Sequence, residues 1–135
     1  MKKLAVIAIV FLLFAFSCGK EENYIPDYPV NYSVTLSEFS IRAINGILLV
    51  PNQGVAGLII VRTSTNEYVA FDRCSTVNPE KACAVEPEDG MFLAIDPCSG
   101  GKFSLLDGSP QKSPAKRALK RYALNIAGQN ILVRN

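Results

Sequence analysis

Short runs of apolar residues, many of them β-branched, alternate with polar residues along the chain from Tyr32 onward. This pattern predicts strands, and the runs cover residues 32–36, 39–44, 47–50, 57–62, 67–72 and 91–95. No stretch has ten or more residues of helical period, and only a short helical turn is expected around 114–119. The pattern therefore predicts one all-β, antiparallel domain over residues 32–135.

Two turn signals support this assignment. Asn45-Gly46 separates two apolar runs, and both residue types tolerate positive φ, which predicts a tight hairpin. Near the C-terminus, the alternating run 122–126 is followed by Gly128-Gln129-Asn130 and then by a second apolar run, 131–134. This arrangement predicts a closing hairpin.

The N-terminus carries a different pattern. Lys2 and Lys3 precede an unbroken apolar run over residues 4–16. A helix needs about 20 apolar residues to span a bilayer, and this run is shorter. Residues 1–17 are therefore predicted to be a signal peptide rather than a membrane helix.

The end of this segment, Ser17-Cys18, resembles a bacterial lipobox, in which the Cys thiol is diacylated and the preceding peptide is removed. Lipid on Cys18 would hold the protein on a membrane, because each buried methylene contributes about 0.8 kcal/mol. The alternative is that Cys18 is an ordinary thiol after a conventional secretory cleavage site.

Residues 18–31 are expected to form a lipidated tether. Lys20, Glu21 and Glu22 resemble the export signal that sends lipoproteins of the Bacteroidetes group to the outer face of the outer membrane. Pro26 and Pro29 favour an extended chain after it. We expect a lipid-anchored outer-membrane protein on the cell surface; the alternative is a solvated tether on a periplasm-facing protein.

Charge and composition exclude several function classes. The chain has 14 Lys+Arg and 12 Asp+Glu, and loss of Lys2 and Lys3 with the signal peptide leaves these charges balanced. Nucleic-acid binding normally needs a large basic surplus, so none is expected. The chain has no His, which excludes Ser-His-Asp and Cys-His nucleophiles as well as metal sites built on histidine. We therefore expect no catalysis.

The stretch from Glu67 to Arg134 resembles the Rieske iron-sulfur domain family. Its members present two loops, Cys-x-His and Cys-Pro-x-His-Gly-Ser-x-Phe, each preceded by a strand. Here residues 68–73 lead into Cys74-Ser75-Thr76, and residues 91–95 lead into a segment, 96–103, with the sequence DPCSGGKF. The chain from Phe103 to the last apolar run also resembles the family's tail. The resemblance implies a Rieske-like β domain.

When the two family loops are aligned with this sequence, which we call the family frame, Cys74 falls at the first cysteine ligand and Thr76 at the first histidine. Asp96 falls at the second cysteine and Ser99 at the second histidine. A Rieske [2Fe-2S] cluster is held by two thiolates and two imidazoles. Thr and Ser cannot replace imidazole as neutral nitrogen donors. We therefore expect these four positions to be degenerate, meaning that they no longer hold a cluster, and we expect no cofactor. If a cofactor is bound, the resemblance implies [2Fe-2S].

The resemblance also implies a disulfide. In many respiratory members a disulfide ties the two loops together; Cys98 falls at its second-loop position, and Cys83 is the natural first-loop partner. The competing bridge is Cys74 to Cys98, and the sequence leaves both open. An exported protein meets an oxidising environment, which favours pairing. A separate hypothesis is that Cys74, Cys83, Cys98 and Asp96 hold a metal or a non-Rieske cluster.

Together these observations predict an outer-membrane lipoprotein whose Rieske-like domain has lost its cluster. Its expected role is that of a non-catalytic binding or accessory module at the cell envelope, anchored by its lipid and serving an unidentified protein partner. The alternative, implied by the resemblance alone, is an iron-sulfur electron-transfer protein or oxidoreductase component.

Overall fold

The computed structural model describes residues 25–135. The predicted signal peptide and Cys18 lie outside the described residues. Across the part of the chain that is described, no helix is long and apolar enough to cross a membrane.

The larger of two sheets has six strands in the order β1-β10-β9-β4-β3-β2. Every neighbouring pair in it is antiparallel, which confirms the predicted fold class. The closing hairpin is confirmed as β9 and β10, which are paired along their length. The strand bounds are β1 (Asn31–Thr35), β2 (Ile47–Val50), β3 (Leu58–Ser64), β4 (Glu67–Asp72), β9 (Arg121–Ala127) and β10 (Asn130–Arg134).

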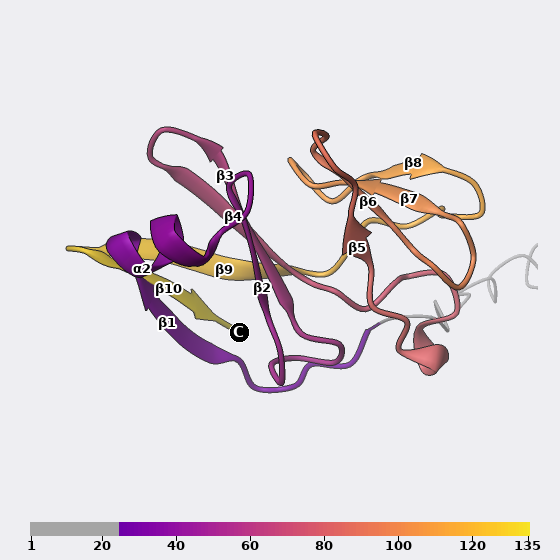
Figure 1. The fold of residues 1–135 in the computed structure, drawn as a ribbon. Coiled ribbons are helices and arrows are strands. Elements are labelled where there is room, and N and C mark those ends of the chain that lie inside the picture. Colours follow the sequence, from indigo (N-terminus) through magenta and orange to yellow (C-terminus); the bar gives the residue numbers. More distant parts are fainter. Residues whose placement is uncertain (1–24) are drawn as a thin grey trace, which may run out of the picture.

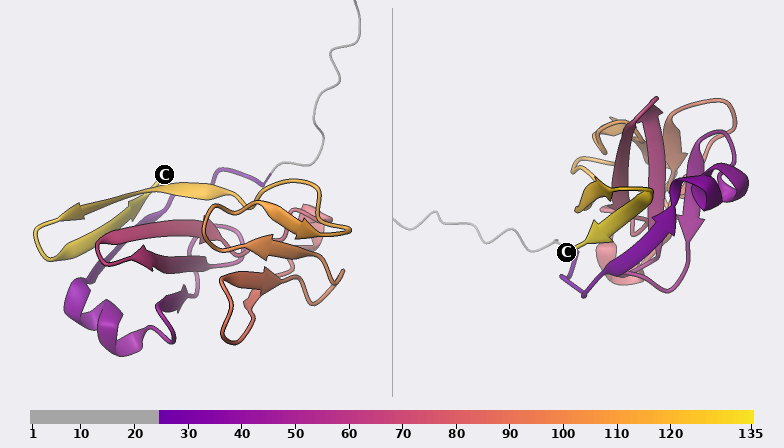
Figure 2. Two further views of the ribbon diagram at one scale, coloured as in Figure 1. Left: turned by 90° about the horizontal axis from the view of Figure 1, so that it is seen from above. Right: turned by 90° about the vertical axis from the view of Figure 1, so that its left-hand side faces the viewer.

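The smaller sheet lies between β4 and β9 in the sequence and has the order β5-β6-β7-β8. Figure 1 shows it beside the larger sheet, and Figure 2 shows the two sheets at opposite ends of an elongated molecule. All its strands are short: β5 (Glu86–Pro87), β6 (Leu93–Ile95), β7 (Lys102–Ser104) and β8 (Pro110–Lys112).

Two hydrophobic cores lie on opposite faces of the central strands. Successive side chains of a strand point to opposite faces, so Leu58 and Ile60 of β3 enter the first core while Ile59 and Val61 enter the second. All four are fully buried. The second core also contains Val85, Ala94, Phe103 and Leu105 from the smaller-sheet region, so it packs the two sheets together and positions the loops between them.

The strand predicted over residues 39–44 is wrong, because the chain forms a short helix there, α2 (Leu36–Arg42). Its N-cap is Thr35, whose Oγ1 accepts a 3.0 Å hydrogen bond from the backbone N–H of Glu38. Thr-x-x-Glu is a helix-starting signal, and Glu38 also pairs with Arg42 one turn later at 2.6 Å. Phe39 is the helix residue that is buried, with its ring edge-on to Tyr68.

The structure also changes two smaller predictions. Asn45 and Gly46 have positive φ, 53° and 78°, as a tight turn requires, but the turn joins only Ile44 to Ile47 in an isolated bridge. Residues 114–119 contain no helix; a 3-10 helix, η1 (Pro79–Lys81), lies instead in the loop after β4.

Candidate functional site

Two loops that are distant in sequence meet at one end of the smaller sheet. We call residues 73–85, after β4, the first loop and residues 96–101, between β6 and β7, the second loop. The first loop is closed by a bridge between Cys74 and Ala84 and by a 2.8 Å hydrogen bond from Ser75 N–H to the Cys83 carbonyl. The second loop is closed by the backbone of Asp96, which bonds to Gly100 and Gly101 at 2.8 Å each. Both loops are therefore held in shape by their own backbones.

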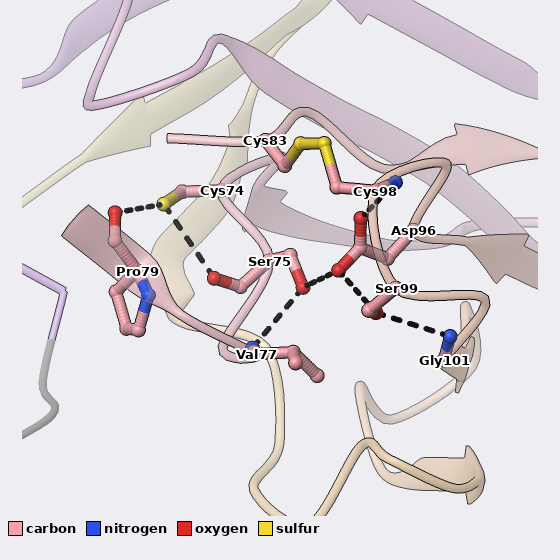
Figure 3. Close-up of a disulfide and its surroundings, with 9 residues drawn as sticks. All are labelled: Cys74, Ser75, Val77, Pro79, Cys83, Asp96, Cys98, Ser99 and Gly101. Atoms are coloured by element: carbon pink, nitrogen blue, oxygen red, sulfur yellow. Dashed lines mark hydrogen bonds between the residues drawn. A yellow bond between two sulfur atoms is a disulfide. The ribbon is translucent and has the colours of Figure 1, made fainter. Parts of the chain in front are cut away.

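Asp96 joins the loops through its buried side chain (Figure 3). One carboxylate oxygen, Oδ2, accepts hydrogen bonds from Ser75 Oγ of the first loop at 2.7 Å and from Ser99 Oγ at 2.6 Å. The other, Oδ1, accepts from the Cys98 backbone N–H at 2.8 Å. Each carboxylate oxygen is thus committed to donors within the protein.

These bonds determine the charge of Asp96. Burial alone would raise the pKa of this carboxyl, but the hydrogen bonds from Ser75, Ser99 and the backbone N–H groups of Cys98 and Ser99 outweigh burial and lower its pKa below the usual value. Hydrogen bonds to a carboxylate favour its ionised form. Asp96 is therefore an anion at neutral pH, stabilised by these hydrogen-bond donors.

A disulfide between Cys83 and Cys98 is the second link between the loops, with Cα atoms 6.4 Å apart. This is the pairing that the family resemblance favoured over Cys74 to Cys98. Cys83 is half-buried and Cys98 is exposed, so the bridge lies at the surface, next to the Asp96 carboxylate (Figure 3).

Cys74 remains a free thiol in the interior. Its Sγ donates weak hydrogen bonds to the carbonyls of Pro79, 3.6 Å away, and Ser75, 3.7 Å away. Burial, together with the negative charges of Asp72, Asp96 and Glu80, raises the pKa of Cys74 to about 11. The thiol is therefore protonated at neutral pH, which makes it neither a nucleophile nor a ready metal ligand.

Thr76 and Ser99, at the two histidine positions of the family frame, do not face a common metal site. Thr76 Oγ1 donates to the Arg117 carbonyl at 2.8 Å, so it ties the first loop to the segment before β9. Ser99 Oγ donates to Asp96 and accepts from Gly101 N–H at 3.2 Å. Both hydroxyls serve loop structure.

These residues do not fit a Rieske cluster. Such a cluster needs two thiolates and two imidazoles, whereas the four frame positions hold one buried thiol, two hydroxyls and one carboxylate. Within residues 25–135, the group close enough to share a metal is Cys83, Asp96 and Cys98, with ligand atoms within 4.8 Å of one another. Cys74 is not part of this group. The two cysteines of the group, Cys83 and Cys98, are joined in the disulfide and so offer no free thiol to a metal.

A second buried carboxylate, Asp72, was not anticipated from the sequence. Its Oδ2 accepts from Val55 N–H at 2.7 Å and from the Tyr122 hydroxyl at 2.8 Å, and its Oδ1 accepts from Ala56 N–H at 3.1 Å and Cys74 N–H at 2.8 Å. Asp72 therefore fixes the start of the first loop against β9 and the β2–β3 connection. The sequence did carry a signal for this site, because Asp72 is a carboxylate at the end of an apolar strand and directly before a loop.

Tyr122 completes this second network. Burial, followed by its hydrogen bond to Asp72 and the charge of that carboxylate, raises the pKa of Tyr122 well above its usual value. The hydroxyl therefore remains a donor over the whole physiological pH range. Gly54 lies against the same pair: a Cβ there would come within 2.3 Å of Asp72 Oδ2 and 2.6 Å of the Tyr122 hydroxyl.

No protein-family model matches the sequence, and a comparison with curated proteins finds no match. Solved structures do match. The plasma membrane Rieske protein PetC3 of the cyanobacterium Synechocystis PCC 6803 superposes with a TM-score of 0.61 and 25% identity, over 81% of this chain and 100% of that chain.

Two further structures share the fold. The ferredoxin of carbazole 1,9a-dioxygenase from Nocardioides aromaticivorans IC177 matches with a TM-score of 0.51 and 17% identity, over 79% of this chain and 97% of its own. A chain from the complex of oxygenase and ferredoxin in carbazole 1,9a-dioxygenase matches with a TM-score of 0.54 and 21% identity, over 78% and 93% of the two chains. The protein thus has a Rieske-like fold, as the sequence resemblance implied.

Proposed function

We propose that this protein is an outer-membrane lipoprotein whose Rieske-like domain lacks a [2Fe-2S] cluster and acts as a non-catalytic binding or accessory module at the cell envelope. The protein partner is unidentified, and nucleic acid is not a partner. The lipid on Cys18 anchors the domain. The tether behind it is shorter than the expected residues 18–31, because Val30 is buried in the first core and Asn31 begins β1.

The observation that carries the proposal is the hydrogen-bonding of Asp96. At a frame position where a cluster would need a thiolate, this carboxylate accepts from Ser75, Ser99 and the Cys98 backbone. The loops are thus joined by bonds that need no metal. A buried network with all donors and acceptors satisfied rigidifies a structure, so these bonds supply the loop-to-loop connection that a cluster would otherwise provide.

Absence of catalysis is supported by the same chemistry. The chain has no His, the buried Cys74 thiol has a pKa raised to about 11, and the Asp96 carboxylate is saturated with hydrogen bonds. A nucleophile needs an adjacent base or a lowered pKa, and these groups provide neither. The proposed role of the domain is therefore binding rather than catalysis.

The second candidate is an iron-sulfur electron-transfer protein or oxidoreductase component. It is favoured by the fold similarity to a plasma membrane Rieske protein at 25% identity. It would require the Cys83–Cys98 disulfide to open and the Asp96 hydrogen bonds to break, because Cys74 is otherwise the sole thiol among the described residues.

Iron analysis of the full-length protein, purified from membranes with detergent, separates the two candidates. We expect colourless protein with no stoichiometric iron and no paramagnetic signal after reduction with dithionite. A visible absorption band with about two irons per chain would overturn the proposal in favour of electron transfer.

Fractionation tests the anchor. Cys18→Ala should move the protein from the membrane fraction to the soluble fraction, because the acyl chains supply the membrane affinity. Replacing Lys20, Glu21 and Glu22 with Ala should reduce cleavage by protease added to intact cells. Unchanged fractionation contradicts lipidation, and unchanged cleavage contradicts surface display.

A further inference from the structure

A cleft of about 710 Å³ lies between β2 and the turn that leads into β6. It shares no residue with the first or second loop. Its apolar lining includes Ile44, Leu49, Met91 and Phe92, whose exposed fractions are 76%, 37%, 58% and 43%. Several exposed large apolar side chains gathered at one cleft are typical of a binding surface rather than of an ordinary protein surface.

One wall of the cleft is an open strand edge. β2 is the terminal strand of the larger sheet and pairs only with β3 among the described strands. Ile47 exchanges two 2.9 Å backbone hydrogen bonds with Ile44 on the side away from β3. Because backbone groups alternate along an antiparallel strand, the N–H and C=O of Leu49 point to this same outer side, and Leu49 itself lines the cleft.

The opposite wall favours pairing on β2 rather than on itself. It begins with Pro87 of β5, which is the terminal strand of the smaller sheet. Proline has no backbone N–H to donate to an added strand. A strand entering the cleft would therefore find its backbone partners on β2 and its apolar contacts on Met91 and Phe92.

The same wall carries an unmet acceptor. Glu88 Oε1 accepts from Lys102 Nζ at 2.7 Å, but its Oε2 is buried and has no hydrogen-bond partner within residues 25–135. Asp89 also lines the cleft and is exposed, while the lining cation, Arg42, is already paired with Glu38 at 2.6 Å. Glu88 and Asp89 are two carboxylates against the single lining cation among the described residues, Arg42, so the lining is complementary in charge to a cationic group.

We propose that this cleft binds an extended segment of a partner protein in which an apolar residue neighbours a Lys or Arg. The segment pairs with the backbone groups of Leu49 that are free among the described residues, on the outer edge of β2. It places its apolar side chain against Met91 and Phe92, and directs its cation to Glu88 and Asp89. Strand addition to an open edge is an established mode of peptide recognition. The inference deepens the proposed binding role and rests on it.

We expect a peptide rather than a small molecule in the cleft, because the open edge offers a backbone N–H and a backbone C=O together. That pair recognises another peptide backbone, and a small cationic molecule would leave it unused. The apolar wall and the carboxylates then select side chains on the added strand.

The test uses the full-length protein in detergent and a pool of end-blocked, fluorescent heptapeptides with a central Val-Lys, Ile-Lys, Val-Arg or Ile-Arg pair. A matched pool carries Glu in place of the basic residue, and a third pool is N-methylated on alternate backbone amides. Fluorescence anisotropy should show saturable binding of the basic pool, and binding at least tenfold weaker for each of the other two pools.

Variants locate the binding site. Glu88→Gln should weaken the best basic peptide at least tenfold, and Asp89→Asn and Phe92→Ala at least threefold each. Glu80→Gln changes an exposed carboxylate of η1, outside the cleft, and should leave the affinity unchanged. Circular dichroism of each variant verifies that it is folded.

Each contrary result overturns the cleft assignment. No saturable binding below 1 mM, equal binding of the Glu pool, equal binding of the N-methylated pool, or folded cleft variants with unchanged affinity would each do so. The iron analysis remains separate: an iron-containing protein that binds the basic pool contradicts the loss of the cluster, whereas an iron-free protein that ignores the pool contradicts only the cleft.

Discussion

Ser75 and Asp96 belong to different loops and are joined by a buried 2.7 Å hydrogen bond between Ser75 Oγ and Asp96 Oδ2 (Figure 3). Both side chains are fully buried. The charge on Asp96 is stabilised by these hydrogen bonds, and hydrogen bonds to a charged group are stronger than neutral ones. This contact, together with the Cys83–Cys98 disulfide, makes the two loops a single rigid unit.

Asp96→Asn should destabilise the domain. The amide supplies two donors where the protein already presents three, so at least one buried donor loses its acceptor. We expect the free energy of unfolding to fall by about 2 to 3 kcal/mol, measured by urea denaturation.

The matched control is Asp107→Asn. Asp107 also accepts from a backbone N–H and a hydroxyl, both of Ser109, but it is exposed. Its replacement should change stability much less. Equal losses for the two variants would show that burial of the Asp96 network does not contribute to stability.

Acid should weaken the same network. The folded pKa of Asp96 lies below its ordinary value because its hydrogen bonds outweigh burial, so its contribution is complete above the unfolded pKa of about 3.9 and is lost as the pH falls through the folded pKa. The unfolding free energy of the native protein should therefore drop below about pH 4. Asp96→Asn should show a shallower drop; an equal slope would assign the acid sensitivity to other carboxyls.

The cysteines should differ sharply in reactivity. In the chain carrying Cys18→Ser, three cysteines remain, and Cys74 is the free one. Because it is buried with a pKa raised to about 11, we expect no reactive thiol in the native protein at pH 8, one in denaturant and three after reduction. Mass spectrometry should locate the label in denaturant on Cys74. A label on Cys83 would instead support the Cys74–Cys98 bridge.

Gly54→Ala tests the packing around Asp72 and Tyr122. Gly54 and Gly128 have nearly equal φ, +60° and +61°, but a Cβ at Gly128 meets nothing within 4 Å. In both Ala variants the left-handed backbone should lower the free energy of unfolding by about 1 to 2 kcal/mol. Gly54→Ala should lose about 2 kcal/mol more, because the methyl group displaces the Asp72 hydrogen bonds. Equal midpoints in thermal unfolding would contradict this close packing.

Much of the fold was predictable because strand patterns are local. The strands β3 and β4 follow from short β-branched apolar runs, and the final hairpin follows from alternation around a turn, both of which any short window reveals. The helix at α2 was missed because its apolar residues also suit a strand, although Thr35 and Glu38 carry the capping signal. Its side chains are polar or exposed except for Leu36 and Phe39, which pack against the first core, so tertiary packing of these two side chains decides in favour of the helix.

The sequence by itself determined the chemistry that is absent: with no His, no Rieske ligand set can form, whatever the fold. It also determined the strand-rich architecture. Only the tertiary structure decided that Asp96 meets Ser75, that Cys83 rather than Cys74 faces Cys98, and that β2 and the turn before β6 enclose a cleft. These pairs are distant in sequence, and their contacts depend on how the second core packs the two sheets together, which no local pattern records.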